Sequence, residues 1–321
     1  MVPKTKDTLR VLITGGSGML GANLACYLVQ TRPQWQLHLS YHSHHVEMPG
    51  VTSHQADLLD EDAVKGLMEE TKPQLIIHCA ALTDLDYCEE HPGEALLVNT
   101  GTTMSMMWWA SHWDSRLIYI STDAVFGQER KRPFTERSEP QPLSEYAFTK
   151  LNGEWDALCL GEKALVLRTC IFGLNPTPRQ SLAEWMVAEL AAGNSIRGFT
   201  DVRFNPILST DFAEALLIAI EYKLSGIYHV SGADALSKYD FGVLLAHTFG
   251  YDPTMVKPAE VASISLLAPR PSAPILGCRK FIHATGHKLP SIKAGVEKLY
   301  QQYIDGYQKK LKSFYIDERR S

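Results

Sequence analysis

The feature that most constrains the fold lies near the start of the chain, where a short apolar run leads into three glycines spaced three residues apart. The segment reads VLITGGSGMLGANLACYLV and places Gly15, Gly18 and Gly21 between a strand pattern and a helix pattern. In such a unit the first glycine permits a tight turn, the second admits a pyrophosphate and the third lets the helix approach the strand. The helix N-terminus offers free N–H groups to the phosphates. This context favours a nucleotide-binding loop over a glycine-rich turn without a ligand.

Short apolar runs alternate with helical patterns through the first half of the chain. This alternation predicts an α/β fold, a Rossmann-type doubly wound parallel sheet with helices on both faces. Ligands of such sheets bind outside the carboxyl ends of the strands. The predicted strands are 10–14, 36–41, 74–79, 116–121 and 164–169, and the predicted helices are 18–31, 60–71, 93–113 and 144–160.

The pattern changes at about residue 174, where prolines interrupt it. We expect residues 1–173 to form an NAD(P)-binding Rossmann domain and 174–321 to form a smaller substrate-binding lobe. The two should be interleaved, with some later segments returning to the first sheet. We expect helices at 181–193 and 209–223, a strand at 226–230, and a frayed or exposed helix in the charged tail after about residue 305.

Composition excludes several classes of protein. The chain has 321 residues and a formal net charge of -5, without the basic stripe of a nucleic-acid binder. No apolar run approaches the roughly 18 residues of a membrane helix, and the N-terminus has no signal-peptide core. Six scattered cysteines without a C-x-x-C motif indicate free thiols and a cytoplasmic protein.

The residues after the second predicted strand bear on which dinucleotide binds. NAD-binding proteins usually place an acid there to hold the adenosine ribose. Here Ser40 and His42 occupy the region, and no acid occurs before Glu47. The absence of a repelling carboxylate favours NADP(H), whereas NAD(H) stays an alternative because the usual arginine is also missing. The histidines within 42–45 lack a closed set of ligands, so we predict no metal site.

A second acid in this region is Asp57, within HQADLLD. Its carboxylate can accept a hydrogen bond from the adenine amino group. The alternative is that Asp57 caps the helix predicted to start at about residue 60.

Polar residues that can carry proton transfer follow the fourth predicted strand. RLIYISTDAVFG ends with Thr122 at the ligand-facing edge, and LSEYAFTK places Tyr146 and Lys150 on one face of the next helix. The Tyr-x-x-x-Lys spacing is common by chance, but here it follows a glycine loop and a strand-end threonine. A nearby ammonium lowers the pKa of a phenol, Lys150 can also bind the nicotinamide ribose, and Thr122 can orient a substrate oxygen. Together they predict hydride transfer between a carbonyl and an alcohol.

These segments resemble the extended short-chain dehydrogenase/reductase family, and within it the dTDP-4-dehydrorhamnose reductase-like branch. The matching text spans nearly the whole chain: TGGSGMLG, HCAALTDLDYCEEHPGEALLVNTGT, YISTDAVFG, PLSEYAFTKLNGE, LRTCIFG, NPILSTDFAEAL, GIYHVSG and APRPSAPILGCRKF. The resemblance implies an NAD(P)H-dependent oxidoreductase that reduces the 4-keto group of a nucleotide-activated deoxysugar.

The resemblance also implies roles for individual residues. Thr122, Tyr146 and Lys150 would be the catalytic residues, and Asn99 would hold a structural bend. The expected cofactor-binding residues are Gly15, Gly18, Met19, Leu20, Gly21, Ser40, His42, Asp57, Leu58, Ala80, Ala81, Thr83, Asn99, Tyr146 and Lys150, and the expected substrate residues are Thr83, Asp86 and Thr122.

Neighbouring activities in this family differ at recognisable positions. Sugar-nucleotide dehydratases follow the catalytic threonine with Asp-Glu, whereas this chain has Asp123 and Ala124. Hexose 4-epimerases usually carry two serines there. The chain also departs from the rhamnose-pathway reductases, with Cys170 in place of an aromatic residue and Ala124 in place of a tyrosine. Reduction therefore fits best, while the identity of the sugar stays open.

The sequence leaves two alternatives to the reductase open and suggests a second copy of the chain as a binding partner. The first rival is a nucleotide-sugar epimerase, and the second is a non-catalytic NADP-binding regulatory subunit like the β subunit of methionine adenosyltransferase. The aromatic stretch MSMMWWASHW at 104–113 is expected to be core or a dimer surface. In the resembling family this helix often helps to form a dimer, so we predict a homodimer.

Overall fold

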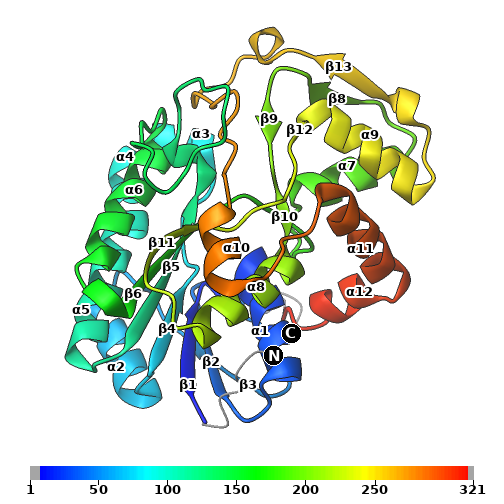
Figure 1. Cartoon of the computed structure of the whole chain (residues 1–321). Helices are drawn as coiled ribbons and strands as arrows, with labels where there is room; N and C mark the ends of the chain where they lie inside the picture. Colours follow the sequence, from blue (N-terminus) through cyan, green and yellow to red (C-terminus); the bar gives the residue numbers. More distant parts are fainter. Residues whose placement is uncertain (1–7, 317–321) are drawn as a thin grey trace.

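A seven-stranded parallel sheet organises the computed structural model, which describes residues 8–316 (Figure 1). The strand order is β11-β6-β5-β4-β1-β2-β3. The chain winds outward from β1 in one direction, returns beside β1 at β4 and winds outward in the other direction, as in Rossmann folds. The strands are β1 (Arg10–Thr14), β2 (Gln36–Tyr41), β3 (Val51–Gln55), β4 (Leu75–His78), β5 (Arg116–Thr122), β6 (Ala164–Thr169) and β11 (Gly226–His229).

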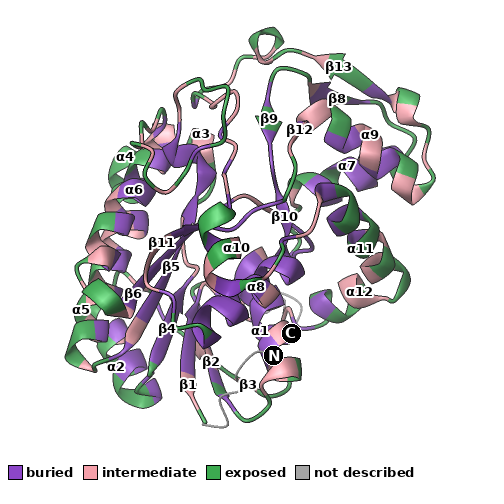
Figure 2. Cartoon of the chain, in the orientation of Figure 1, coloured by how far each residue is buried: buried purple, intermediate pink, exposed green. Residues whose placement is uncertain are grey.

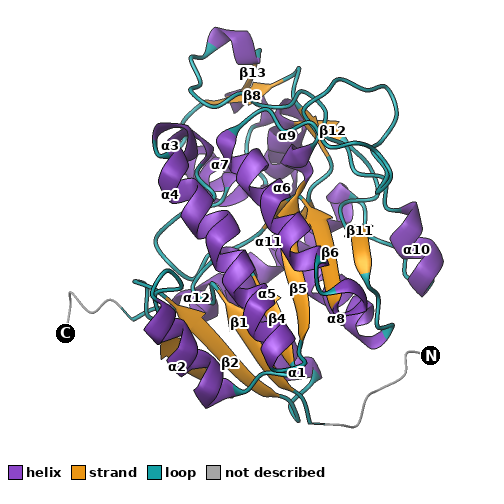
Figure 3. Ribbon diagram, turned by 90° about the vertical axis from the view of Figure 1, so that its left-hand side faces the viewer, coloured by secondary structure: helices purple, strands orange, loops and turns teal. Residues whose placement is uncertain are grey.

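Alternate side chains of the strands serve two separate cores, one on each face of the sheet. On β1, Val11 and Ile13 belong to one core and Leu12 to the other, and all three are fully buried. This is the period-two pattern of a strand whose two faces are both covered. Helices α1 (Met19–Thr31) and α8 (Ser209–Glu221) cover the first face, and α2 (Glu61–Thr71), α5 (Thr102–His112) and α6 (Glu145–Leu158) cover the second (Figure 3).

The later part of the chain builds a second group of helices around short strand pairs. One of its strands, β11, leaves this group and pairs in parallel with β6 of the central sheet. Figure 2 shows that buried residues continue from the sheet into this part. Its elements are β7 (Ile171–Phe172) with β10 (Ile207–Leu208), β8 (Ile196–Phe199) with β13 (Val256–Ala259), β9 (Arg203–Phe204) with β12 (Leu236–Ser237), and helices α7 (Leu182–Ala191), α9 (Lys238–Phe249), α10 (Arg279–Thr285), α11 (Ile292–Ile304) and α12 (Tyr307–Lys312).

The fold predicted from the sequence is confirmed, with differences at particular elements. All six predicted strands are present, and each of their ends lies within one residue of its expected position. The edge strand β3 was not predicted, because its sequence VTSHQ is polar and only half-buried. The helix predicted at 93–113 is divided into α4 (Pro92–Leu96), a π-helical turn η1 (Leu97–Gly101) and α5, and it follows the short helix α3 (Leu85–Glu90).

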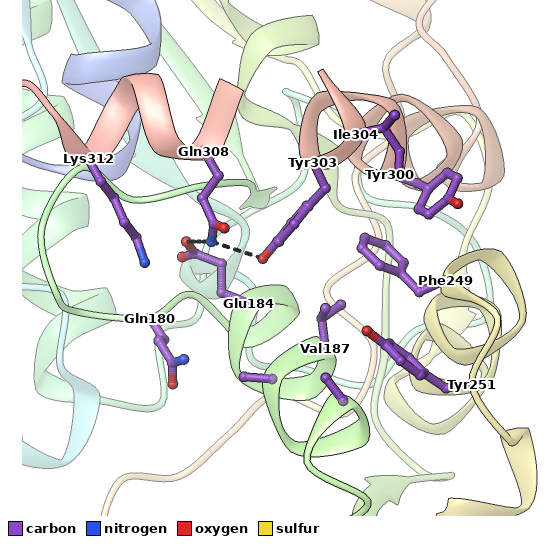
Figure 4. Close-up of a pocket in the computed structure, with 12 residues that line it drawn as sticks. Gln180, Glu184, Val187, Phe249, Tyr251, Tyr300, Tyr303, Ile304, Gln308 and Lys312 are labelled. Carbon is purple, nitrogen blue, oxygen red and sulfur yellow. Dashed lines mark hydrogen bonds between the residues drawn. The ribbon is translucent and has the colours of Figure 1, made fainter. Parts of the chain in front are cut away.

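The expectation of a frayed or exposed helix after residue 305 is wrong for the described residues up to 316, and residues 317–321 lie outside the described part of the chain. Helix α12 is packed because two apolar side chains of this charged segment are buried: Leu311 is fully buried and Phe314 is 9% exposed. A groove of about 480 Å³ lies between α12, α7 and α11. In it, the Gln308 amide nitrogen of α12 contacts Glu184 of α7 and Tyr303 of α11 (Figure 4).

No helix within residues 8–316 combines the length and the apolarity needed to cross a membrane.

Two buried histidines predict how stability depends on pH. His78 at the end of β4 and His229 at the end of β11 are fully buried, and burial lowers the pKa of each to about 3. The unfolded chain therefore binds more protons than the native chain between pH 3 and the ordinary imidazole value of about 6.5. Their stabilising contribution is complete above pH 6.5 and falls by about 1.4 kcal/mol per histidine per pH unit below it.

Asp123 acts in the opposite direction, because burial raises the pKa of its carboxyl group to about 6. Below pH 6 the native chain therefore binds a proton at Asp123 that the unfolded chain does not yet bind. This proton balances the extra proton that one of the two histidines binds in the unfolded chain. We expect the free energy of unfolding, measured by urea titration at pH 7, 6 and 5, to fall with pH. His229→Gln should make that fall shallower, and an unchanged slope in this variant would contradict the assignment.

Candidate functional site

The glycine loop has the geometry that a dinucleotide requires. Gly15 has a φ of +67°, and a Cβ there would lie 2.7 Å from the Ala80 backbone. A Cβ on Gly21 would lie 2.5 Å from the Gly15 carbonyl oxygen. At Gly18 an added Cβ would meet a single atom, the Gly15 oxygen at 3.3 Å, and no side chain caps the α1 N-terminus. Gly15 and Gly21 are therefore needed by the fold, whereas Gly18 leaves room for a phosphate group.

This difference predicts separate effects for two alanine substitutions. Gly18→Ala should leave the melting temperature nearly unchanged but raise the Kd for NADPH by about tenfold or more, because the methyl group fills the space of the pyrophosphate. Gly21→Ala should lower the free energy of unfolding by about 1–3 kcal/mol through overpacking. Calorimetric titration and thermal unfolding of both variants would check this. Equal effects of the two variants on NADPH binding at unchanged stability would contradict it.

The expected adenosine end lies at the carboxyl ends of β2 and β3. Ser40 is buried, and its carbonyl oxygen accepts a hydrogen bond from Gly16 N at 2.8 Å. His42 is largely exposed and lies 3.8 Å from Asp57 between side-chain atoms. The alternative role of Asp57 as a helix cap belongs instead to Asp60, whose carboxylate accepts from two N–H groups at the start of α2. Asp57 stays a predicted contact for adenine, with Leu58 beside it.

The loop after β4 lies against the glycine loop. Ala80 N donates to Thr14 Oγ1 at 3.3 Å, and Ala81 follows it at the same sheet edge. Asn99 fixes the continuation of this loop, because its amide oxygen accepts from Leu82 N at 2.8 Å and its amide nitrogen donates to Leu82 O at 3.1 Å. Asn99 lies within η1, so the side chain expected to hold a bend lies at an irregular turn of the helix.

The three predicted catalytic residues come from two neighbouring elements. Thr122 ends β5, and its hydroxyl donates to Asp123 Oδ1 at 3.2 Å and accepts from Ala124 N at 3.1 Å. Tyr146 lies in the first turn of α6, which Ser144 caps by accepting from Ala147 N. Burial raises the pKa of Tyr146, and a hydrogen bond with Thr122 partly opposes that rise. Tyr146 and Thr122 therefore lie close enough for the Thr122 hydroxyl to influence the pKa of Tyr146.

Lys150 is buried one turn further along α6, with 3% exposure. Its Nζ lies 4.0 Å from the centre of the Tyr119 ring. Burial lowers the pKa of Lys150 to about 7, although the neighbouring Cys79 and Glu154 favour the charged form. The expected depression of the Tyr146 pKa is not found, because burial outweighs the other influences on that phenol.

Beneath the catalytic residues lies a buried ion pair. Arg168 on β6 donates to both carboxylate oxygens of Glu154 on α6, at 2.8 and 2.6 Å. Ser121 Oγ donates to the same carboxylate at 2.5 Å. Both charged side chains are at most 3% exposed.

Three polar side chains from distant segments, Asp123, Cys170 and Lys238, influence the pKa values of one another. Burial raises the pKa of Asp123 to about 6, while hydrogen bonds with the Thr122 and Cys170 side chains and the charge of Lys238 lower it. Lys238 is the first residue of α9, and burial lowers its pKa. The sequence carried no signal for Lys238, because only the tertiary fold brings α9 to the end of β5.

Asp86 links the two parts of the chain above the predicted substrate position. Its carboxylate accepts from Ala268 N at 2.9 Å and from Arg270 Nη2 at 3.0 Å. Thr83 is exposed in the preceding loop. Asp86 is thus engaged with the loop around residues 268–270, and its contact with a sugar stays a prediction.

The cysteines and histidines do not form a metal centre in the described part of the chain. All six cysteines are free thiols. Within residues 8–316, no group of three or more His, Cys, Asp or Glu side chains is arranged to hold a metal ion.

Comparison with known families gives one match over most of the chain. The model described as RmlD substrate binding domain matches residues 9–304. A probable low-salt glycan biosynthesis reductase of Haloferax volcanii is 31% identical over 301 residues, 91% of this chain and 98% of the relative. The dTDP-4-dehydrorhamnose reductase of Mycolicibacterium smegmatis is 31% identical over 278 residues, 86% of this chain and 80% of the relative.

A relative that is not named as a reductase is similar to the same degree. Methionine adenosyltransferase 2 subunit beta of Xenopus laevis is 32% identical over 296 residues, 86% of this chain and 82% of the relative. Among solved structures, a dTDP-4-dehydrorhamnose reductase from Bacillus anthracis has the same fold. It was solved in complex with NADP, has a TM-score of 0.80 and 23% identity, and the match covers 92% of this chain and 100% of that one.

Proposed function

The chain belongs to the RmlD substrate binding domain family of extended short-chain dehydrogenase/reductases, and from this we propose that it is an NADPH-dependent reductase of the 4-keto group of a dTDP-activated deoxysugar. The observation that carries the proposal is the arrangement of Thr122, Tyr146 and Lys150. They lie at the carboxyl end of β5 and the start of α6, on the sheet edge that also presents the glycine loop. This combination of groups can donate a proton and hold a nicotinamide ribose, which are two needs of hydride transfer to a carbonyl.

The residues of the chain supply the proton and the positioning. When bound, NADPH supplies a hydride for the carbonyl carbon of the sugar. Tyr146 donates its phenolic proton to the carbonyl oxygen, which leaves an alcohol on the sugar and a phenolate on the enzyme. The raised pKa of Tyr146 keeps the phenol protonated at neutral pH, as reduction requires. Lys150 stabilises the phenolate, and Thr122 orients the oxygen that receives the proton.

NADPH is preferred over NADH in this proposal. The segment after β2 carries His42 at its exposed start, and Glu47 is the first acid beyond the strand. A carboxylate near the 2′-phosphate would repel it, and an imidazole can donate a hydrogen bond to it. The glycine loop supports binding of the pyrophosphate, which both dinucleotides share.

The nucleotide-sugar substrate is proposed from the relatives, and its exact sugar is open. A dTDP-4-dehydrorhamnose reductase is 31% identical over 86% of this chain. Cys170 and Ala124 replace the expected aromatic residues beside Asp123. The resemblance places both positions near the sugar, so they bear on which sugar is turned over.

The experiment that tests this function is a turnover measurement on the full chain. We expect purified protein to oxidise NADPH in the presence of dTDP-4-keto-6-deoxy-L-mannose, or of another dTDP-4-keto sugar, and the absorbance of NADPH at 340 nm follows this. Stable binding of NADPH with interconversion of the sugar and no net oxidation would instead indicate an epimerase.

A second candidate is a regulatory subunit, which the 32% identity to methionine adenosyltransferase 2 subunit beta favours. A protein of this kind needs the cofactor site but not the proton donor. Binding of NADPH without turnover of any dTDP-4-keto sugar, together with co-purification of a methionine adenosyltransferase, would support this function over the reductase.

We also propose that the chain forms a homodimer through the outer face of α5 and α6, which we call the α5/α6 patch. Met104 and Trp108 of α5 are 54% and 55% exposed, and Phe148 and Trp155 of α6 are 46% and 57% exposed. These two helices lie side by side on one face of the molecule (Figure 3). A second copy is the partner that the family resemblance suggests for this helix.

Charge placed in the α5/α6 patch should separate the two copies. We expect Trp108→Glu to elute as a monomer in size-exclusion chromatography with light scattering, whereas the unaltered chain elutes as a dimer. Ile304→Glu is the matched control, because Ile304 is 62% exposed outside the patch. A monomeric unaltered chain would refute the dimer, and dissociation by both substitutions would refute the patch as its location.

The proposal extends to the domain bounds of the chain and to its location in the cell. We infer that residues 1–173 form the dinucleotide-binding domain and that residues 174–321 form the substrate-binding lobe, with β11 returning to the first sheet. We also infer a cytoplasmic location, which the six free thiols support.

A further inference from the structure

The last described segment of the chain, Tyr307–Ile316, packs against the cofactor-binding half, and we call it the C-terminal strap. It comprises α12 and the four residues that follow, and it lies beyond residue 304, where the family match ends. Its apolar side chains Leu311 and Phe314 are buried in the core between α1 and the second lobe. The strap is therefore a packed addition to the fold that the family shares.

At its start, the strap contacts the helix that follows the glycine loop. Tyr307 OH donates to Asn23 Oδ1 at 2.9 Å. The amide nitrogen of Asn23, which is fully buried in α1, donates to Met19 O at 2.7 Å and to Leu174 O at 2.8 Å. The strap thus fixes a side chain within the first two turns of α1.

At its end, the strap pairs with the loop between β2 and β3, which we call the specificity loop (residues 42–50). Glu47 N donates to Phe314 O at 2.8 Å, and Ile316 N donates to His45 O at 3.0 Å. These two bonds enclose an antiparallel bridge between Val46 and Tyr315. The specificity loop is therefore held from one side by main-chain bonds to the strap. From the other side, Ser53 Oγ of β3 donates to Val46 O at 2.6 Å.

The specificity loop begins at the position where Rossmann proteins distinguish NADP from NAD. Its first residues are His42, Ser43 and His44, all exposed. Ser43 Oγ and His44 Nδ1 are 3.1 Å apart, and the His44 ring lies 6.0 Å from the ring of Tyr315 in the strap. The three residues that can donate hydrogen bonds to a phosphate thus directly precede the strand bridge.

We propose that the C-terminal strap is a positioning element for cofactor specificity: its pairing with His45–Glu47 holds the three preceding donors where the 2′-phosphate of the adenosine binds. This inference rests on the proposed use of NADPH. Without the pairing, these residues must be ordered when the cofactor binds, and ordering each one costs conformational entropy. This cost weakens the binding of NADPH, because NADPH contacts the loop through its 2′-phosphate. It does not affect NADH, which has no group at that position. Loss of the strap pairing therefore weakens NADPH and spares NADH.

The experiment compares variants that differ by one N–H group or by four residues. Ile316→Pro removes the N–H that donates to His45 O, and Ile316→Ala is the matched control that keeps it. A chain ending at Lys312 loses the whole bridge, and a chain ending at Ile316 keeps it. The Kd values for NADPH and NADH are measured by calorimetric titration of each full-length or shortened protein, with thermal unfolding recorded alongside.

We expect the Kd for NADPH to rise about fivefold in Ile316→Pro and about tenfold or more in the chain ending at Lys312, with the Kd for NADH within about twofold. Ile316→Ala and the chain ending at Ile316 should match the unaltered protein. Equal weakening of both dinucleotides, or an unchanged ratio of the two Kd values, would overturn the role of the strap and leave the reductase intact. If the unaltered protein bound NADPH and NADH equally well, the proposed use of NADPH would be wrong, and the role of the strap would fail with it.

Discussion

Tyr146→Phe reduces turnover of the dTDP-4-keto sugar by about 10²–10⁴-fold and leaves the Kd for NADPH nearly unchanged. Phenylalanine keeps the ring of the α6 side chain but removes the hydroxyl that hydrogen-bonds Thr122 and donates the proton. The fold should tolerate the change, because phenylalanine fills the same ring volume. NADPH oxidation and calorimetric binding, measured on the same preparation, check both parts of the expectation.

The matched control for this substitution is Tyr87→Phe. Tyr87 lies on α3 and is 37% exposed, and its hydroxyl donates to Glu94 rather than to a catalytic residue. It should keep full turnover. If Tyr146→Phe turned over at the unaltered rate, Tyr146 would not be the proton donor, and the carboxyl group of Asp123 would become the candidate, since burial raises its pKa to about 6.

Breaking the buried ion pair beneath the site should have the largest effect on stability. Glu154→Gln and Arg168→Met should each lower the free energy of unfolding by about 3–5 kcal/mol, because each leaves its partner charge buried without compensation. The double variant should be more stable than the sum of the two losses predicts, since it leaves no uncompensated charge. Urea denaturation of the two single variants and the double variant measures this coupling.

An exposed ion pair provides the control for this cycle. Lys293 and Glu297 are 3.8 Å apart on α11, with side chains 71% and 58% exposed. Glu297→Gln should change the free energy of unfolding by less than about 1 kcal/mol. Strictly additive losses at Glu154 and Arg168 would show that their two charges are stabilised independently.

The fold could be predicted because the sheet is buried on both faces. Strands such as β1 and β6 are continuous apolar runs bounded by turn residues, and these runs stand out against the helical patterns. The edge strand β3 has neither property, since it is polar and half-buried. The π-helical turn around Asn99 also has no sequence pattern of its own, because it depends on hydrogen bonds to Leu82 in another segment.

The candidate site could be predicted only where its residues share one local motif. The glycine loop and the Tyr146–Lys150 pair are motifs of this kind. The Glu154–Arg168 ion pair joins α6 to β6, and the charge of Lys238 on α9 lowers the pKa of Asp123, so neither interaction is encoded by spacing along the chain. The direction of the Tyr146 pKa shift also depends on burial, which the sequence alone did not reveal.

The pairing of β11 with β6 has a consequence for the order in which the molecule can be completed during synthesis. Translation finishes β6 at Thr169, but its outer neighbour β11 is not made until His229. All six residues of β6 are buried in the finished protein. Throughout that interval the nascent chain carries an apolar strand with an open edge, which is the kind of surface that pairs with other chains. A ribosome that stalls between these two points would therefore hold an aggregation-prone intermediate, and the arrival of β11 ends that vulnerable period.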